Sequence, residues 1–72
     1  MEVFSKRLRE ERKAAGLSQR ELAEKLGISQ STYKGYEFMG TSTGRQPSLE
    51  IVCKIAEVLG VSVDYLLGLK EI

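Results

Sequence analysis

The sequence predicts an all-α protein, a compact bundle of five short helices. Apolar residues recur at spacings of three and four along most of the chain, and no segment alternates apolar and polar residues over a useful length. A serine precedes four of the predicted helices, and a glycine follows four of the five. Seventy-two residues make a single domain, 1–72, near the lower size limit for a self-supporting core.

The first predicted helix covers residues 4–15 and is ended by Gly16. Phe4, Leu8 and Ala15 give it an apolar stripe, and Arg12 falls on the same side. A buried guanidinium without a partner is costly, so Arg12 is expected to have one.

Residues 17–37 are expected to form two helices joined by a tight turn. Ser18 and Glu21 have the spacing of a capping box, in which each side chain accepts a hydrogen bond from the other residue's backbone N–H. Gly27 ends this helix because it can adopt the left-handed conformation. Ser29 then caps the next helix, so the pattern restarts at once.

The polar side chains at the start of that next helix are candidates for reading DNA. Tyr33 and Tyr36, three residues apart, are expected to face the core and to leave the other side exposed. Gln can bond adenine, Ser and Thr can bond a base or touch a thymine methyl, and Lys can bond guanine or phosphate. The candidates are Gln30, Ser31, Thr32 and Lys34. A solvated polar face explains this helix, taken alone, equally well.

The second half of the chain begins with a predicted loop, residues 38–47, rich in glycine, serine and threonine. Arg45 is its only charge and a candidate phosphate contact, and a flexible surface connection is an equal alternative. Ser48 caps a fourth helix that runs to about Leu59 and is apolar on nearly all sides, which predicts the central core helix. A short fifth helix is expected over residues 63–67.

Composition argues against several classes of function. The chain has no histidine and one cysteine, Cys53, so neither an internal disulfide nor a zinc site is expected, and Cys53 is expected to be a small buried residue. No motif has the spacing that catalysis or phosphate binding needs, so we predict no enzyme, catalytic residue, metal, cofactor or small-molecule ligand. No apolar run reaches the length of a membrane span and no signal peptide opens the chain, so a cytoplasmic location is expected.

Charge is distributed unevenly along the chain. The net charge is +1, but residues 1–45 contain nine Lys and Arg against six Glu, whereas residues 46–72 contain two Lys against four acidic residues. The basic half also contains the candidate reading helix. A modest attraction to DNA phosphates is therefore expected there.

Three stretches together resemble the Cro/repressor-type (xenobiotic-response-element) helix-turn-helix family of phage and bacterial regulators, which includes the lambdoid phage repressors. They are LSQRELAEKLGISQSTYKGYE, PSLEIVCKIAEVLGVSVDYLLG and the first-helix stretch around Arg12, and they cover nearly the whole chain. The resemblance implies a compact five-helix, lambda-repressor-like bundle with a helix-turn-helix core at 18–37. It also implies that the second helix crosses the DNA backbone and the third enters the major groove.

The resemblance implies a role for each matching position. Gln19 corresponds to a family phosphate contact that also braces the third helix. Gln30 and Ser31 fall on base-reading positions, and Thr32 falls on a usual phosphate contact. Lys34 falls on an outward position one turn later.

Arg12 and Glu37 match a pair that in the family forms an internal ion pair between the first helix and the end of the third. Three features depart from the family pattern. Gly35, expected to point outward, stands where relatives often have a base-contacting side chain. Phe38, expected to fold back onto the domain, replaces a polar residue. The loop that follows is longer than usual, so the assignment of Arg45 rests on charge alone.

The leading interpretation is a sequence-specific DNA-binding transcriptional regulator, a repressor that binds double-stranded DNA as a homodimer, because one short helix reads too few base pairs. Apolar residues near the C-terminus either supply the dimer contact or complete the core: Ile51, Val58, Leu67, Leu69 and Ile72. The alternative is a protein-interaction module of the same fold, such as an antitoxin or a partner-binding regulator. The modest net charge and Gly35 favour this alternative slightly.

Overall fold

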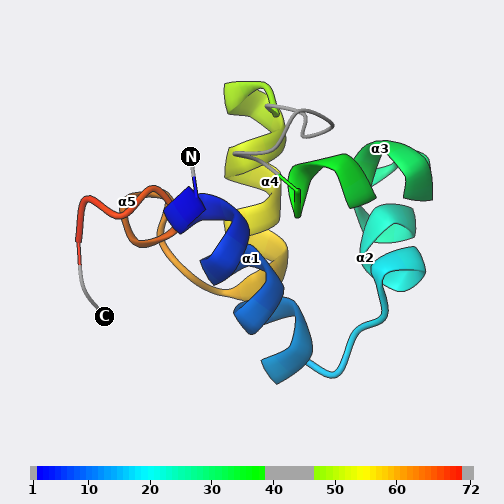
Figure 1. Cartoon of the computed structure of the whole chain (residues 1–72), viewed down its shortest axis with the longest axis horizontal. Helices are drawn as coiled ribbons and strands as arrows, with labels where there is room; N and C mark the ends of the chain where they lie inside the picture. Colours follow the sequence, from blue (N-terminus) through cyan, green and yellow to red (C-terminus); the bar gives the residue numbers. More distant parts are fainter. Residues whose placement is uncertain (1, 39–46, 71–72) are drawn as a thin grey trace.

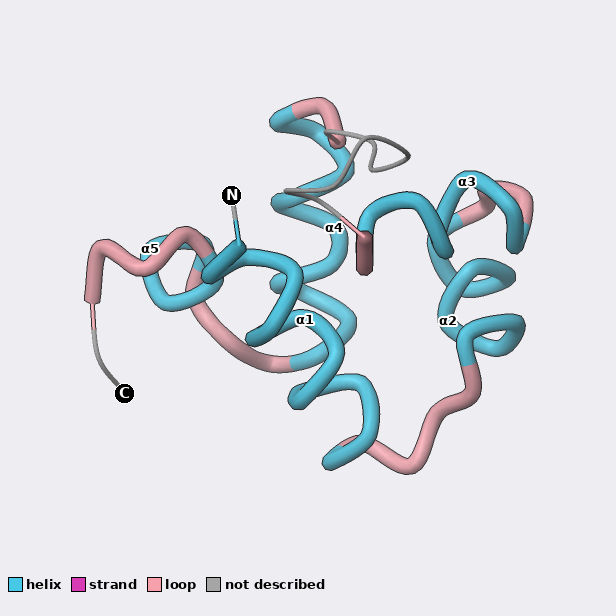
Figure 2. Tube along the Cα trace, viewed as in Figure 1, coloured by secondary structure: helices cyan, strands magenta, loops and turns pink. Residues whose placement is uncertain are grey.

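The structure, a computed structural model, describes residues 2–38 and 47–70 and confirms the predicted all-α class (Figure 1). The described residues form helices and connections without a strand, as Figure 2 shows, and none of these helices has the length and apolarity that a membrane crossing requires. The five helices are α1 (Glu2–Ala14), α2 (Gln19–Leu26), α3 (Gln30–Tyr36), α4 (Leu49–Leu59) and α5 (Val63–Leu66).

Serine side chains begin four of these helices, at the positions that the sequence predicts. The Ser18 hydroxyl accepts the Glu21 N–H at 3.0 Å, and the Glu21 carboxylate accepts the Ser18 N–H at 2.8 Å, so the capping box is confirmed. Ser29, Ser48 and Ser62 each accept a backbone N–H three residues later in the same way. The helix starts are therefore determined by local hydrogen bonds.

The core is formed by one face of each helix. Helix α4 packs against both α2 and α5, α1 packs against α5, and α2 packs against α3. Tyr33 and Tyr36 are buried as predicted and meet edge to face, with their ring centroids 6.4 Å apart. The buried apolar residues are Phe4, Leu8, Leu22, Ala23, Leu26, Tyr33, Tyr36, Val52, Ile55, Ala56, Tyr65 and Leu66.

Helix α4 is buried along one stripe rather than on nearly all sides. The stripe is formed by Val52, Ile55 and Ala56, which follow helical spacing and face the neighbouring helices. Cys53 directly follows Val52 in the sequence but is exposed, so the prediction of a buried cysteine is wrong. Leu49, at the first position of the helix, is 70% exposed.

Two expectations about the end of α3 are also wrong. Phe38 is 44% exposed instead of folded back, because its N–H bonds the Gly35 carbonyl at 3.2 Å and the chain leaves the helix there. Gly35 is buried instead of outward, since it carries only backbone atoms and its carbonyl is engaged at the helix end. Residues 39–46 lie outside the described residues, and so does Arg45.

Helix α1 also holds the C-terminal part of the described chain. The Arg7 guanidinium donates to the Tyr65 carbonyl at 2.6 Å and to the Lys70 carbonyl at 3.0 Å, and it lies 4.4 Å from the centroid of the Tyr65 ring. The Tyr65 hydroxyl donates to the Glu11 carboxylate at 3.3 Å. These contacts attach α5, which is too short to be stable alone, to α1.

Candidate nucleic-acid interface

The start of α3 presents polar side chains to solvent because its opposite face is anchored in the core. Tyr33 and Tyr36 are buried, whereas Gln30, Ser31 and Lys34 are exposed. Figure 1 shows α3 at the edge of the molecule beside α2, with α1 and α5 on the other side. The first turn of α3 carries no acidic residue, so it presents hydrogen-bonding groups without negative charge.

Thr32 is only half-buried, and its hydroxyl is oriented by the N-cap residue of the helix. The Ser29 hydroxyl accepts the Thr32 N–H at 3.1 Å and donates its own proton to Thr32 Oγ1 at 2.9 Å. A hydroxyl carries one proton, so the proton of Thr32 itself stays available for an acceptor. A phosphate oxygen is such an acceptor.

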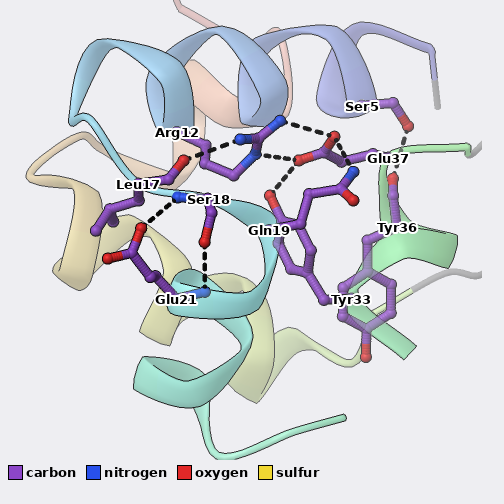
Figure 3. Close-up of polar contacts among 9 residues, drawn as sticks. All are labelled: Ser5, Arg12, Leu17, Ser18, Gln19, Glu21, Tyr33, Tyr36 and Glu37. Carbon is purple, nitrogen blue, oxygen red and sulfur yellow. Dashed lines mark hydrogen bonds and ion pairs between the residues drawn. The ribbon is translucent and has the colours of Figure 1, made fainter. Parts of the chain in front are cut away.

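Glu37, at the C-terminal end of α3, receives donors from three helices (Figure 3). Its Oε2 accepts Arg12 Nε at 2.7 Å and the Tyr33 hydroxyl. Its Oε1 accepts Gln19 Nε2 at 3.0 Å and Arg12 Nη2 at 3.4 Å. Arg12 Nη1 donates to the Leu17 carbonyl at 2.9 Å, so the guanidinium is also attached to the start of the α2 region. The structure thus brings together the two residues that the resemblance pairs.

The ion pair is buried and stays ionised at neutral pH. Arg12 is 9% exposed and Glu37 is 5% exposed. Burial disfavours the charged carboxylate, but hydrogen bonds from Arg12, Tyr33 and Gln19 outweigh it and hold the pKa of Glu37 below its usual value. The hydrogen bond to Glu37 raises the pKa of Arg12, and burial raises the pKa of Tyr33, so the tyrosine remains neutral. Every buried side-chain N or O atom in the described residues has a hydrogen-bond partner.

Comparison with known proteins identifies the family to which this arrangement of helices belongs. The sequence model of the helix-turn-helix family matches residues 8–66, which include all of α2, α3 and α4. The chain belongs to the helix-turn-helix family, in its Cro/C1-type branch. No solved structure matches it significantly.

Several curated relatives of this helix-turn-helix chain are bacterial or phage regulators. It is 42% identical over 69 residues to the uncharacterized HTH-type transcriptional regulator YobD of Bacillus subtilis, covering 96% of the chain and 58% of YobD. It is 40% identical over 69 residues to the HTH-type transcriptional regulator ImmR of the same organism, covering 96% and 51%. It is 40% identical over 65 residues to the cryptic phage CTXphi transcriptional repressor RstR of Vibrio cholerae, covering 90% and 54%. The chain therefore spans about half the length of the curated relatives it matches.

In this helix-turn-helix, α2 and α3 are the paired helices and pack against each other. Gln19 is the first residue of α2, is half-buried, and bonds Glu37 at the far end of α3. The structure places five of the six predicted DNA-contacting residues on these two helices, and Arg45 lies outside the described residues. The five are Gln19, Gln30, Ser31, Thr32 and Lys34.

Sequence reasoning missed one residue that holds the helix-turn-helix in place. The buried Ser5 hydroxyl, on α1, donates to the Tyr36 carbonyl at 2.9 Å, which attaches the last turn of α3 to α1 (Figure 3). The two residues are 31 positions apart, and a serine in the middle of a helix gives no local signal of such a partner. Only its place near the apolar stripe of α1 could have indicated burial.

Proposed function

We propose that this helix-turn-helix domain binds double-stranded DNA sequence-specifically, as the DNA-binding part of a transcriptional regulator. The observation that carries the proposal is the exposed, uncharged start of α3 on a helix whose other face is locked by two buried tyrosines. In this fold, the residues at the start of that helix contact base edges in the major groove. Relatives named as transcriptional regulators support the proposal, and RstR, named a repressor, favours repression. The domain acts by binding alone, in the cytoplasm.

The five candidate residues fall into two groups in this proposal. Gln30 and Ser31 read base edges, because a glutamine amide can bond adenine at two positions and a serine can bond either type of group. Lys34, Thr32 and Gln19 bond backbone phosphates, which position the protein without reading sequence. Specificity is therefore concentrated on two uncharged side chains.

The proposed binding species is a homodimer on a two-fold-related site, since one seven-residue helix reads few base pairs. Of the apolar residues predicted for the dimer contact, Val58 and Leu69 are exposed, Leu69 at 74%. Ile51 and Leu67 are half-buried against the core, and Ile72 lies outside the described residues. Val58 and Leu69 are thus the candidates to examine for self-association.

A protein-interaction module of the same fold is the competing function. One of its two sequence arguments was that Gly35 leaves an outward position without a reading side chain. Gly35 is buried and has no side chain, so it supplies no reading group and this argument still holds. The modest net charge of +1 remains in its favour.

Selection of bound duplexes from a random library, at near-physiological salt, tests the proposal directly. A palindromic enriched site with half-sites about one helical turn apart is the expected result. Weak binding that disappears with added salt and enriches no sequence would contradict specific reading, since phosphate contacts alone produce that behaviour. Such a result would direct the search to a protein partner.

A further inference from the structure

We propose that Glu37 is a positioning residue for DNA binding: its carboxylate holds the Gln19 amide in one orientation, with one N–H free to bond a backbone phosphate. The inference rests on the proposed DNA-binding function and on the phosphate contact expected of Gln19. It assigns to a buried residue, which cannot itself touch DNA, an effect on affinity that is separate from its effect on stability.

The orientation follows from what a carboxylate can bond. An ionised carboxylate only accepts hydrogen bonds, whereas an amide has a donating NH2 group and an accepting oxygen. Gln19 Nε2 lies 3.0 Å from Glu37 Oε1, and the flipped amide would put two acceptors at that distance. One hydrogen of Nε2 therefore points to Glu37 (Figure 3). The second hydrogen is left, and a phosphate oxygen, which only accepts, can bond it.

The carboxylate is itself held in place, so it can act as a fixed reference for Gln19. Arg12 bonds both of its oxygens, Nε at 2.7 Å and Nη2 at 3.4 Å, and prevents rotation of the group. Arg12 also compensates its charge. An approaching phosphate therefore meets a neutral pair behind Gln19, and not an exposed negative charge.

A held side chain binds a phosphate at lower entropic cost than a mobile one, because its rotamer is already selected. Gln19 is half-buried at the first position of α2, where the backbone of the helix fixes its Cα. Removal of the carboxylate leaves the amide free to rotate or to turn its oxygen outward. Either change weakens the phosphate bond without altering any residue on the DNA surface.

A double-mutant cycle on the selected duplex tests this coupling. The proteins are the wild type, Glu37→Gln, Gln19→Ala and the double variant. Glu37→Gln keeps an amide oxygen that can accept from Arg12, so unlike Arg12→Ala it is expected to stay folded, and Kd is measured by fluorescence anisotropy well below each melting temperature. Loss of one hydrogen bond to a charged group predicts a Kd about tenfold higher for each single variant. The double variant is expected to bind no more weakly than either single variant, because both remove the same contact. Losses that multiply in the double variant would overturn the inference.

Ser5→Ala is the matched control for a purely structural effect. It removes a buried bond between α1 and the end of α3 but does not touch Glu37 or Gln19. We expect a lower melting temperature and a Kd that rises much less than in Glu37→Gln. If Ser5→Ala weakens binding as much as Glu37→Gln does, the carboxylate acts through the general placement of α3, and the inference is wrong.

The side-chain amide signals of Gln19 in a proton–nitrogen correlation spectrum give a readout without DNA. Gln19→Ala identifies them by their loss. In the wild type, one amide proton is expected to be shifted and slow to exchange, and Glu37→Gln is expected to abolish both properties. Unprotected signals in the wild type would overturn the inference.

The failures of the two proposals can be told apart. A wild type that binds the selected duplex, with a Gln19→Ala variant of equal Kd, overturns the role of Glu37 alone. A wild type that shows no specific binding overturns the proposed function and, with it, this inference.

Discussion

At the scale of single residues, the Arg12–Glu37 pair is the contact whose loss should cost most. In Arg12→Ala, Glu37 stays buried with only the Tyr33 and Gln19 donors, and breaking a buried pair from one side costs about 3–5 kcal/mol. A domain of this size has about 3–5 kcal/mol of stability in total. We therefore expect Arg12→Ala to be largely unfolded at 25 °C, as measured by circular dichroism during urea unfolding.

Arg9→Ala is the control for this prediction, because Arg9 lies on the same helix and is exposed. Surface substitutions of this kind usually change stability by less than about 0.5 kcal/mol. An Arg12→Ala variant as stable as Arg9→Ala would show that the ion pair contributes nothing net.

The same carboxylate predicts how stability depends on pH. Hydrogen bonds hold the pKa of Glu37 below its usual value of 4.5 in the folded state, so the unfolded chain binds the proton more readily. The ionised Glu37 carboxylate therefore contributes to the free energy of unfolding. This contribution is complete above about pH 4.5 and is lost as the pH falls through the pKa of Glu37 in the folded state. We expect the melting temperature to fall between pH 5 and pH 3, roughly the range over which carboxylates titrate, and to fall less in Glu37→Gln.

Glu21 also makes the domain less stable at low pH, because hydrogen bonds from the Ser18 backbone and hydroxyl lower the pKa of Glu21 as well. The Glu37→Gln curve should therefore be flatter than that of the wild type but not flat. Glu21→Gln is the comparison variant, with a smaller effect expected because Glu21 is exposed. Parallel curves for the wild type and Glu37→Gln would contradict the assignment.

Only part of this residue-scale network can be predicted from the sequence. Arg12 interrupts an apolar stripe, which is a local signal that it needs a partner. The partner is 25 residues away, and the resemblance, not the pattern, names Glu37. The sequence predicts Tyr33 as a core residue. It predicts neither the bond from Tyr33 to Glu37 nor the bond from Ser5 to Tyr36, because neither leaves a signature in the local sequence.

At the scale of secondary-structure elements, substitutions at different residues of α3 are expected to reduce sequence specificity and overall DNA affinity separately. Gln30→Ala is expected to weaken binding to the selected site by about 1–3 kcal/mol and to leave binding to random duplex unchanged. Lys34→Ala should weaken binding to both duplexes and reduce the salt dependence by about one unit of slope. Equal loss on both duplexes for Gln30→Ala, in anisotropy titrations, would mean that Gln30 does not read a base.

The glycines that follow α4 and α5, Gly60 and Gly68, are expected to differ in how much stability the domain loses when each is replaced by alanine. Gly60 and Gly68 both have positive φ, +72° and +79°, so alanine at either position costs about 1–2 kcal/mol from backbone strain. Apart from its neighbours along the chain, no heavy atom of the described residues lies within 4 Å of a Cβ built at Gly60, whereas a Cβ at Gly68 would lie 2.9 Å from Cγ1 of Val3. Val3 is β-branched and held in α1, so it has little freedom to move.

We therefore expect Gly68→Ala to lower the melting temperature more than Gly60→Ala. Adding Val3→Ala to Gly68→Ala should recover most of the difference by removing the clash. Equal melting temperatures for the two single glycine variants would show that α1 does not pack tightly against the turn after α5.

Element starts and ends were predictable because their causes are local. A serine three residues before a free N–H, or a glycine after the last apolar position, acts within one turn. The structure places serine N-caps on α2 to α5 and glycine C-caps on α2 and α4. The buried side of α4 was not predictable in this way. When apolar residues surround a helix, its neighbours decide which stripe is buried, and this choice left Cys53 and Leu49 at the surface.

At the scale of the whole molecule, α1 connects the two ends of the fold. It holds the end of α3 through Ser5 and Arg12, and it holds α5 through Arg7. Figure 1 shows α1 between α5 and the α2–α3 pair. Helix α3 is thus supported mainly by α1 and α2, and the exposed Leu69 lies beyond α5, apart from the helix-turn-helix.

The size of the domain predicts how a dimer should respond to the spacing of its half-sites. The described chain measures 29 × 26 × 21 Å, so two copies side by side can place their α3 helices about 34 Å apart, the distance of one DNA turn. Inserting five base pairs between the selected half-sites turns one of them to the opposite face of the duplex. Affinity is then expected to fall to that of a single half-site. Inserting ten base pairs restores the face but adds about 34 Å between the two domains. A dimer contact made by the described part of the chain would then be lost, and affinity is not expected to recover. Electrophoretic mobility shifts on the three duplexes check this directly, and affinity unchanged by either insertion would mean that two monomers bind independently.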